Sequence, residues 1–163
     1  MTTPDSDHAR RGGAPVAALD QLPGREARAV GWLREWCEGP DGQTRVWQDA
    51  VGRLGAARAR ACLSAFEQLL GLILAHGRRP LMRHSTGCTC VGADEAVFAQ
   101  FLTSAATGEA EDAMMLASLL VRADMAPTVY GLARTAGLGL LAGRAAAPAM
   151  AANVTWPATA MRH

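Results

Sequence analysis

The chain has 163 residues, of which 50% are hydrophobic and 19% are charged, and its formal net charge is +1. This length suits a single domain with a sizeable core. The small net charge argues against a dedicated nucleic-acid-binding protein, which usually carries a clear basic excess. Aromatic residues make up only 5% of the chain, so smaller apolar residues such as leucine and alanine must fill most of the core, a composition that favours helices.

The start of the sequence and its longest apolar run bear on the cellular location. Residues 1–13 are polar and include two aspartates, which is not typical of a secretory signal. The apolar run over residues 69–75 is far too short to span a bilayer. We therefore expect a cytoplasmic protein without membrane association, in which the four cysteines are thiols or metal ligands rather than a disulfide framework.

Apolar residues recur at helical spacing through most of the chain, and strand-like alternation persists nowhere. In the first periodic segment Trp32, Leu33 and Trp36 fall on one broad face, whereas Arg34 and Glu35 are expected off it. Breaker residues between the segments predict where helices end. The expected helices run over about residues 20–38, 43–54, 56–75, 94–107, 109–122 and 124–137.

The pattern predicts an all-α fold, a single compact helical bundle of about six helices joined by short turns. We expect the helical domain over residues 20–142. A disordered arm over residues 1–19 should precede it, and a flexible tail rich in alanine and proline, residues 143–163, should follow. A loop rich in cysteine, histidine and arginine, residues 76–92, separates two helical halves.

This loop contains the residue types of a metal site. His76, His84, Cys88 and Cys90 offer two imidazoles and two thiols within fifteen residues, a set that tetrahedral Zn²⁺ accepts. In extended backbone a Cys-x-Cys pair points both side chains the same way, so both sulfurs can reach one ion. The sequence therefore predicts a Zn²⁺ site, with Cu(I) or iron as other soft-metal candidates.

A second interpretation uses Cys88 and Cys90 for thiol chemistry. Nearby arginines and an expected helix N-terminus just after Cys90 both favour the thiolate form. A disulfide within Cys-x-Cys closes a small, strained ring, and strained disulfides are the labile kind. The pair is therefore also a candidate redox switch. The plainest interpretation makes both cysteines small buried side chains, with the histidines at helix ends.

Other residues near the loop have weaker claims to a role. Arg78, Arg79 and Arg83 are candidates for contact with an anion, a phosphate or a nucleic acid, or else form a solvated connector. Asp94 and Glu95 are expected in the first turn of a helix, where negative charge suits the macrodipole. Either would be an alternative metal ligand if His76 belongs to the preceding helix.

Two further sets of side chains fall in helical segments. Cys37 and Cys62 are expected to pack in the core. Trp32, Trp36 and Trp47 are expected to form a packed aromatic cluster. Any of these tryptophans that is exposed would instead indicate a surface for a partner.

Motifs of common enzyme classes are absent from the sequence: there is no glycine-rich phosphate loop with a following lysine, no Gly-x-Ser-x-Gly and no His-Glu-x-x-His. These absences favour a non-catalytic protein. We therefore predict a small cytoplasmic Zn²⁺-binding protein that acts as a regulatory or adaptor module through a protein partner. The alternatives are a redox switch built on Cys88 and Cys90, and a metal-free helical interaction module or nucleic-acid-binding regulator.

Overall fold

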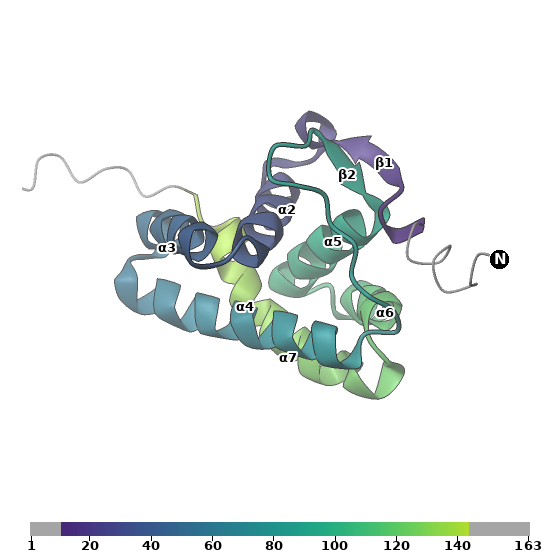
Figure 1. The fold of residues 1–163 in the computed structure, drawn as a ribbon. Helices are drawn as coiled ribbons and strands as arrows, with labels where there is room; N and C mark the ends of the chain where they lie inside the picture. Colours follow the sequence, from purple (N-terminus) through teal and green to yellow (C-terminus); the bar gives the residue numbers. More distant parts are fainter. Residues whose placement is uncertain (1–10, 144–163) are drawn as a thin grey trace, which may run out of the picture.

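The structure, a computed structural model, describes residues 11–143 and shows a helical bundle with a small sheet at one end (Figure 1). This confirms the predicted bundle, including its six main helices within the described residues. In chain order the elements are β1 (Pro15–Ala18), the 3-10 turn η1 (Leu19–Gln21), α2 (Gly24–Cys37), α3 (Pro40–Leu54), α4 (Ala56–His76), β2 (Cys90–Gly92), α5 (Ala93–Thr107), α6 (Ala110–Leu120), the 3-10 turn η2 (Ala123–Met125) and α7 (Ala126–Leu141).

The core forms where α7 packs against both α4 and α5, while α2 packs against α5 and α3. Phe66 of α4 is fully buried. Its ring makes edge-to-face contacts with Trp32, Trp36 and Phe98, at centroid distances of 5.8, 5.5 and 6.1 Å. Such contacts add to the burial of apolar area, so this aromatic group joins α2, α4 and α5. None of the described helices combines the length and the apolar character needed to cross a membrane.

The turns explain how α3 is placed. The breakers Gly39 and Pro40 mark the start of α3, with Pro40 in its first turn, where proline is well tolerated because its missing N–H has no helical partner. Gly55 alone separates α3 from α4, with a φ of 77° that favours glycine. The two helices therefore form a tight helical hairpin.

The two short strands are not expected from the sequence. β1 pairs antiparallel with β2, with Ala17 opposite Val91 and Ala18 opposite Cys90. The prediction that residues 15–18 belong to a disordered arm is therefore wrong, because their backbone is ordered by pairing with a strand more than seventy residues away. The remainder of the predicted arm, residues 1–10, and the predicted tail over residues 144–163 lie outside the described residues.

The loop from Gly77 to Thr89 connects the end of α4, beside α6, with the sheet near the start of α5 (Figure 1). At its beginning Gly77 forms an isolated backbone bridge with Val121, just after α6. Towards its end the Thr89 carbonyl accepts a hydrogen bond from the Leu19 amide, at 2.8 Å. The loop is therefore fixed at both ends to separate parts of the bundle.

Candidate metal centre

Three of the predicted metal ligands meet at the sheet end of the loop. His84 and Cys88 lie in the loop, and Cys90 is the first residue of β2. The Cys88 sulfur is 3.4 Å from His84 Nδ1 and 3.2 Å from the Cys90 sulfur. The three potential ligand atoms lie within 4.8 Å of one another, and all three residues are half-buried. The structure thus brings together an imidazole and two thiols that are close enough to hold one ion.

The orientation of the His84 ring decides which nitrogen is available. Nε2 lies 2.8 Å from the carbonyl oxygen of Gly13. Because a carbonyl only accepts, Nε2 carries the proton and neutral His84 presents the lone pair of Nδ1 towards Cys88. A Cβ at Gly92 would lie 3.2 Å from the His84 ring, so glycine at this position gives the imidazole room. A metal-binding histidine usually has its other nitrogen fixed in this way.

The distances are compatible with a thiolate-rich metal site. In tetrahedral zinc sites, bonds of about 2.3 Å to sulfur and 2.0 Å to nitrogen place two sulfurs about 3.8 Å apart and a sulfur about 3.5 Å from a nitrogen. The Sγ–Sγ distance here is 3.2 Å and the Nδ1–Sγ distance is 3.4 Å. Opening the sulfur pair by about 0.6 Å would bring that pair to the tetrahedral spacing, and Nδ1 lies within 4.8 Å of the Cys90 sulfur.

Arg34 of α2 holds the backbone of both cysteines. Its Nη1 donates to the Cys88 carbonyl and its Nη2 to the Cys90 carbonyl, both at 2.6 Å. Arg34 is 1% exposed, although its place in the helical pattern predicts a position off the apolar face. This role is missed by sequence reasoning, because one arginine among sixteen basic residues carries no local sign that its partners lie more than fifty residues away.

Glu95 of α5 binds both Arg34 and the backbone of the loop. It is fully buried, and its carboxylate accepts hydrogen bonds from the amides of His84 and Gly92 as well as two from Arg34. Burial alone would raise the pKa of Glu95, but these donors together lower the pKa below its ordinary value. The predicted position in the first helical turn is correct. The carboxylate, however, binds Arg34 and the loop rather than joining the ligand group.

Asp94, the residue before Glu95, also holds the loop through its carboxylate. Its carboxylate is bound by both terminal nitrogens of Arg79 and by the Met82 amide, at 2.8 Å. Asp94 is 4% exposed. The two neighbouring carboxylates at the start of α5 therefore anchor two separate points of the loop, around Met82 and around His84.

The two thiols differ in acidity because they share a hydrogen bond. A hydrogen bond from Cys90, followed by one from the protonated ring of His84, lowers the pKa of Cys88 to about 7. The same contact raises the pKa of Cys90, because a thiolate at Cys88 disfavours a second negative charge beside it. The pKa of His84 is raised by its hydrogen bond to Gly13 and then by Cys88. In the ion-free state Cys88 is thus the first of the two thiols to ionise.

The remaining predicted ligand, His76, is not part of this group. It is the last residue of α4, and its Nδ1 lies 3.4 Å from Nη2 of Arg122. Of the loop arginines, Arg78 donates to the Ser118 carbonyl and Arg79 pairs with Asp94. Each of these side chains has an interaction within the protein.

Arg83 and the two remaining cysteines are not part of the ligand group. Arg83 is 3.6 Å from the carboxylate of Glu38. Cys62 is buried as expected, whereas Cys37 is exposed, so the prediction that it packs in the core is wrong. Cys37 is the last residue of α2, and its side chain faces solvent while the preceding Trp36 packs against Phe66.

Comparison of the chain with protein-family models, with curated proteins and with solved structures found no match. The chemistry of the site is therefore judged from its geometry alone.

Proposed function

We propose that the protein binds one Zn²⁺ ion through His84 Nδ1 and the sulfurs of Cys88 and Cys90, and that the bound ion regulates its contact with a protein partner. One observation carries the metal assignment. The hydrogen bond from His84 to Gly13 leaves the other ring nitrogen directed at the Cys88 sulfur, which lies beside the Cys90 sulfur. An imidazole and two thiolates suit Zn²⁺, and the thiolates would also accept Cu(I).

The number of ligands favours an exchangeable ion. Within residues 11–143 the group supplies three ligand atoms from half-buried side chains. Structural zinc sites are closed by four protein ligands, whereas three ligands leave a position open to water or another group. An ion held in this way can exchange with its surroundings, as a regulatory site requires. The reduced thiols it needs suit the reducing cytoplasm.

The support of the loop also favours regulation over a purely structural role. Arg34, Asp94 and Glu95 fix the loop by hydrogen bonds that need no ion. In small metal-dependent domains, by contrast, binding and folding occur together. We therefore expect the helical fold to persist after the metal is removed, and the ion to change mainly the exposed surface of the loop.

Cobalt substitution tests this proposal directly, because Co²⁺ in a thiolate site gives a sulfur-to-metal charge-transfer band. The reduced protein should bind one Co²⁺ per chain with such a band, and excess Zn²⁺ should displace it. Cys88→Ser and Cys90→Ser should each weaken the band, and the double variant should abolish it. Cys37→Ser is the matched control, because that cysteine is exposed and outside the group. A band that survives in the double variant, or none in the native protein, would refute the proposal.

A second function, a thiol redox switch, is favoured by the 3.2 Å separation of the Cys88 and Cys90 sulfurs. With a peroxide as oxidant, the Cys88 thiolate attacks a peroxide oxygen, giving a sulfenic acid and hydroxide. The Cys90 thiol then attacks that sulfur, which forms a disulfide and releases water. Starting from the Cys88 thiolate and the Cys90 thiol, the overall change removes two electrons and one proton from the pair, and a bound metal would protect both sulfurs.

Mass spectrometry of the metal-free protein after peroxide treatment tests this second function. A switch should lose two hydrogens within the peptide that contains both cysteines, and a thiol reductant should restore them. Prior loading with Zn²⁺ should slow the reaction. Oxidation of Cys88 to the sulfinic acid without disulfide formation would count against a reversible switch.

A further inference from the structure

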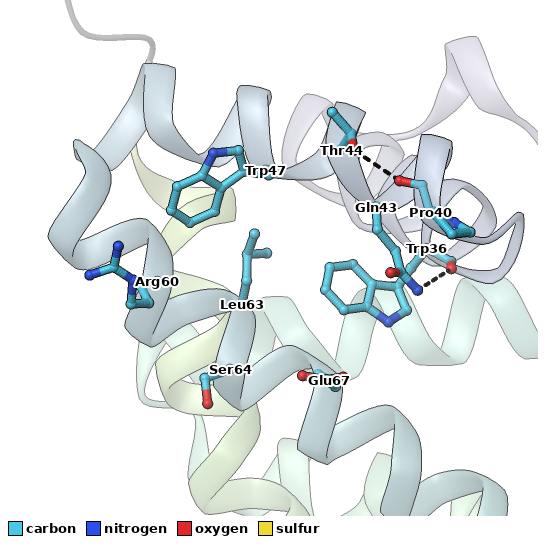
Figure 2. A pocket seen from close by; sticks show the side chains of 9 residues that line it. All are labelled: Trp36, Pro40, Gln43, Thr44, Trp47, Arg60, Leu63, Ser64 and Glu67. Carbon is cyan, nitrogen blue, oxygen red and sulfur yellow. Dashed lines mark hydrogen bonds between the residues drawn. The ribbon is translucent and has the colours of Figure 1, made fainter. Parts of the chain in front are cut away.

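A groove of about 520 Å³ lies away from the metal centre, between α3 and α4 and beside the end of α2 (Figure 2). Its size is within the range of binding sites for ligands or partner side chains. Two half-buried tryptophans and a leucine supply its apolar surface, and polar or charged residues surround them. The lining residues are Trp36, Pro40, Gln43, Thr44, Trp47, Arg60, Leu63, Ser64 and Glu67.

The apolar part of the groove is already formed. In Figure 2 the side chain of Leu63 lies between the indole rings of Trp36 and Trp47. Trp36 is held from behind by an edge-to-face contact with the buried ring of Phe66, at 5.5 Å. Rigid aromatic side chains of this kind are typical anchors of protein interfaces, because little conformational entropy is lost when a partner binds.

The two groove tryptophans differ from the buried one in their hydrogen bonds. The Nε1 of Trp32 donates to Asp49, at 2.9 Å. Within residues 11–143, no protein acceptor is found for the indole N–H of Trp36 or Trp47. Both rings therefore combine an apolar face with an N–H that no described residue accepts, as tryptophans at interfaces commonly do.

Opposite charges mark the two ends of the groove. Arg60 lies beside Trp47 near the α3–α4 turn, and Glu67 lies beside Trp36 (Figure 2). Both are exposed, and neither takes part in an ion pair within the described residues. Seven residues of helix separate them, which corresponds to about 10 Å along α4. The groove thus has a positive end, an apolar middle and a negative end.

We propose that this groove binds a helical segment of a partner protein that presents an acidic residue, apolar residues and a basic residue along one face. An acidic residue at position i would meet Arg60, apolar residues at i+3 and i+4 would pack over Leu63 and the two indole rings, and a basic residue at i+7 would meet Glu67. This spacing matches both the length of the groove and the period of a helix. The inference rests on the partner-binding part of the proposed function, and the groove lining includes none of the three metal ligands.

The position of the groove between two antiparallel helices favours a helix as the bound segment. The groove lies between two helices of a hairpin, and a third helix packs its apolar ridge into such a depression. The charges at the two ends then set the direction of the bound segment, because a reversed helix would place like charges together.

Selection from a displayed library of helical peptides tests this inference. The library fixes a helical scaffold and randomises positions i, i+3, i+4 and i+7, and the bait is the full chain. We expect enrichment of acidic, apolar, apolar and basic residues in that order. The charge-exchanged bait, Arg60→Glu with Glu67→Arg, should enrich the opposite order. A selected peptide should bind the charge-exchanged bait roughly fivefold more weakly than the native one.

Trp47→Ala should weaken binding of a selected peptide about tenfold or more, whereas Met115→Ala, at an exposed position on α6, should leave it unchanged. Enrichment without the charge order, no enrichment, or binding that Trp47→Ala does not affect would each overturn the inference. A dimer that forms with concentration and is lost in Trp47→Ala would also overturn it, because a second copy would then occupy the groove. Repeating the selection on the Cys88→Ser, Cys90→Ser variant separates this result from any failure of the metal proposal.

Discussion

The guanidinium of Arg34 and the carboxylate of Glu95 form a bidentate ion pair, with Nε–Oε1 and Nη2–Oε2 distances of 2.7 and 2.8 Å. Both side chains are almost completely buried. The pair joins α2 to the start of α5, and the same two side chains bind the backbone of His84, Cys88 and Cys90. The candidate ligands are therefore positioned by a buried polar network that reaches two helices.

Replacement of Glu95 by glutamine should strongly destabilise the fold. The change keeps the shape of the side chain but leaves the charge of Arg34 buried without its counter-ion. We expect the free energy of unfolding to fall by about 3–5 kcal/mol, measured by urea denaturation. Glu111→Gln, at an exposed position in α6, is the matched control and should cost less than about 0.5 kcal/mol. Equal effects of the two substitutions would contradict the assigned role of the ion pair.

The substitution Arg34→Lys should weaken metal binding more than it affects the helices. Lysine keeps the positive charge but lacks the planar fork that reaches both cysteine carbonyls and Glu95. Residues that orient metal ligands typically change the affinity about 10–100-fold when replaced. Competition with a chromophoric chelator measures this change. Arg53→Lys, which alters an arginine bound to Asp49, should retain native affinity; a similar loss there would indicate a non-specific effect.

The lowered pKa of Glu95 predicts a specific dependence of stability on pH. A carboxyl with a lower pKa in the folded state than in the unfolded state stabilises the fold above the unfolded pKa, which is about 4.3 for glutamate. That contribution should be lost progressively as the pH falls below this value. Urea denaturation at several pH values should show a smaller acid-dependent loss in Glu95→Gln than in the native protein. Identical pH profiles would show that Glu95 does not contribute.

Most helices could be predicted from the sequence, because apolar periodicity is a local signal. The predicted helix over residues 56–75 differs from α4 by a single residue at its end. Strand β1 could not be predicted in the same way. Pro15–Ala18 has no alternating pattern, and its conformation depends on a partner strand that is distant in the sequence. Only the folded chain brings these two segments together.

The candidate site was predictable only in part. The residue types and spacing of His84, Cys88 and Cys90 are enough to indicate metal chemistry. Arg34 and Glu95 carry no comparable sign, because sequence periodicity cannot reveal that two charged residues 61 positions apart form a buried pair. His76 shares the ligand type of His84, but it ends α4 and lies outside the ligand group.

The pKa of Cys88, lowered to about 7, predicts selective alkylation in the reduced, metal-free protein. The rate of modification by iodoacetamide should rise with a midpoint near pH 7, because the thiolate is the nucleophile. Cys37 provides an internal comparison: although its side chain is exposed, partial desolvation of its thiol raises the pKa above the ordinary value, so its midpoint should be higher. His84→Ala should move the Cys88 midpoint upward by removing one of the contacts that lower this pKa. Peptide mapping distinguishes the sites, and equal midpoints for Cys37 and Cys88 would contradict this account.

The most direct test of the metal assignment is the zinc content of freshly purified, reduced protein. We predict about one zinc per chain in the native protein and in Cys37→Ser, and none in the Cys88→Ser, Cys90→Ser variant. After chelation the native protein should keep its helical circular dichroism but melt at a lower temperature, because an ion that binds only the folded state stabilises it. Reduced native protein that contains no zinc, and binds added zinc no more tightly than the double variant, would contradict the central claim.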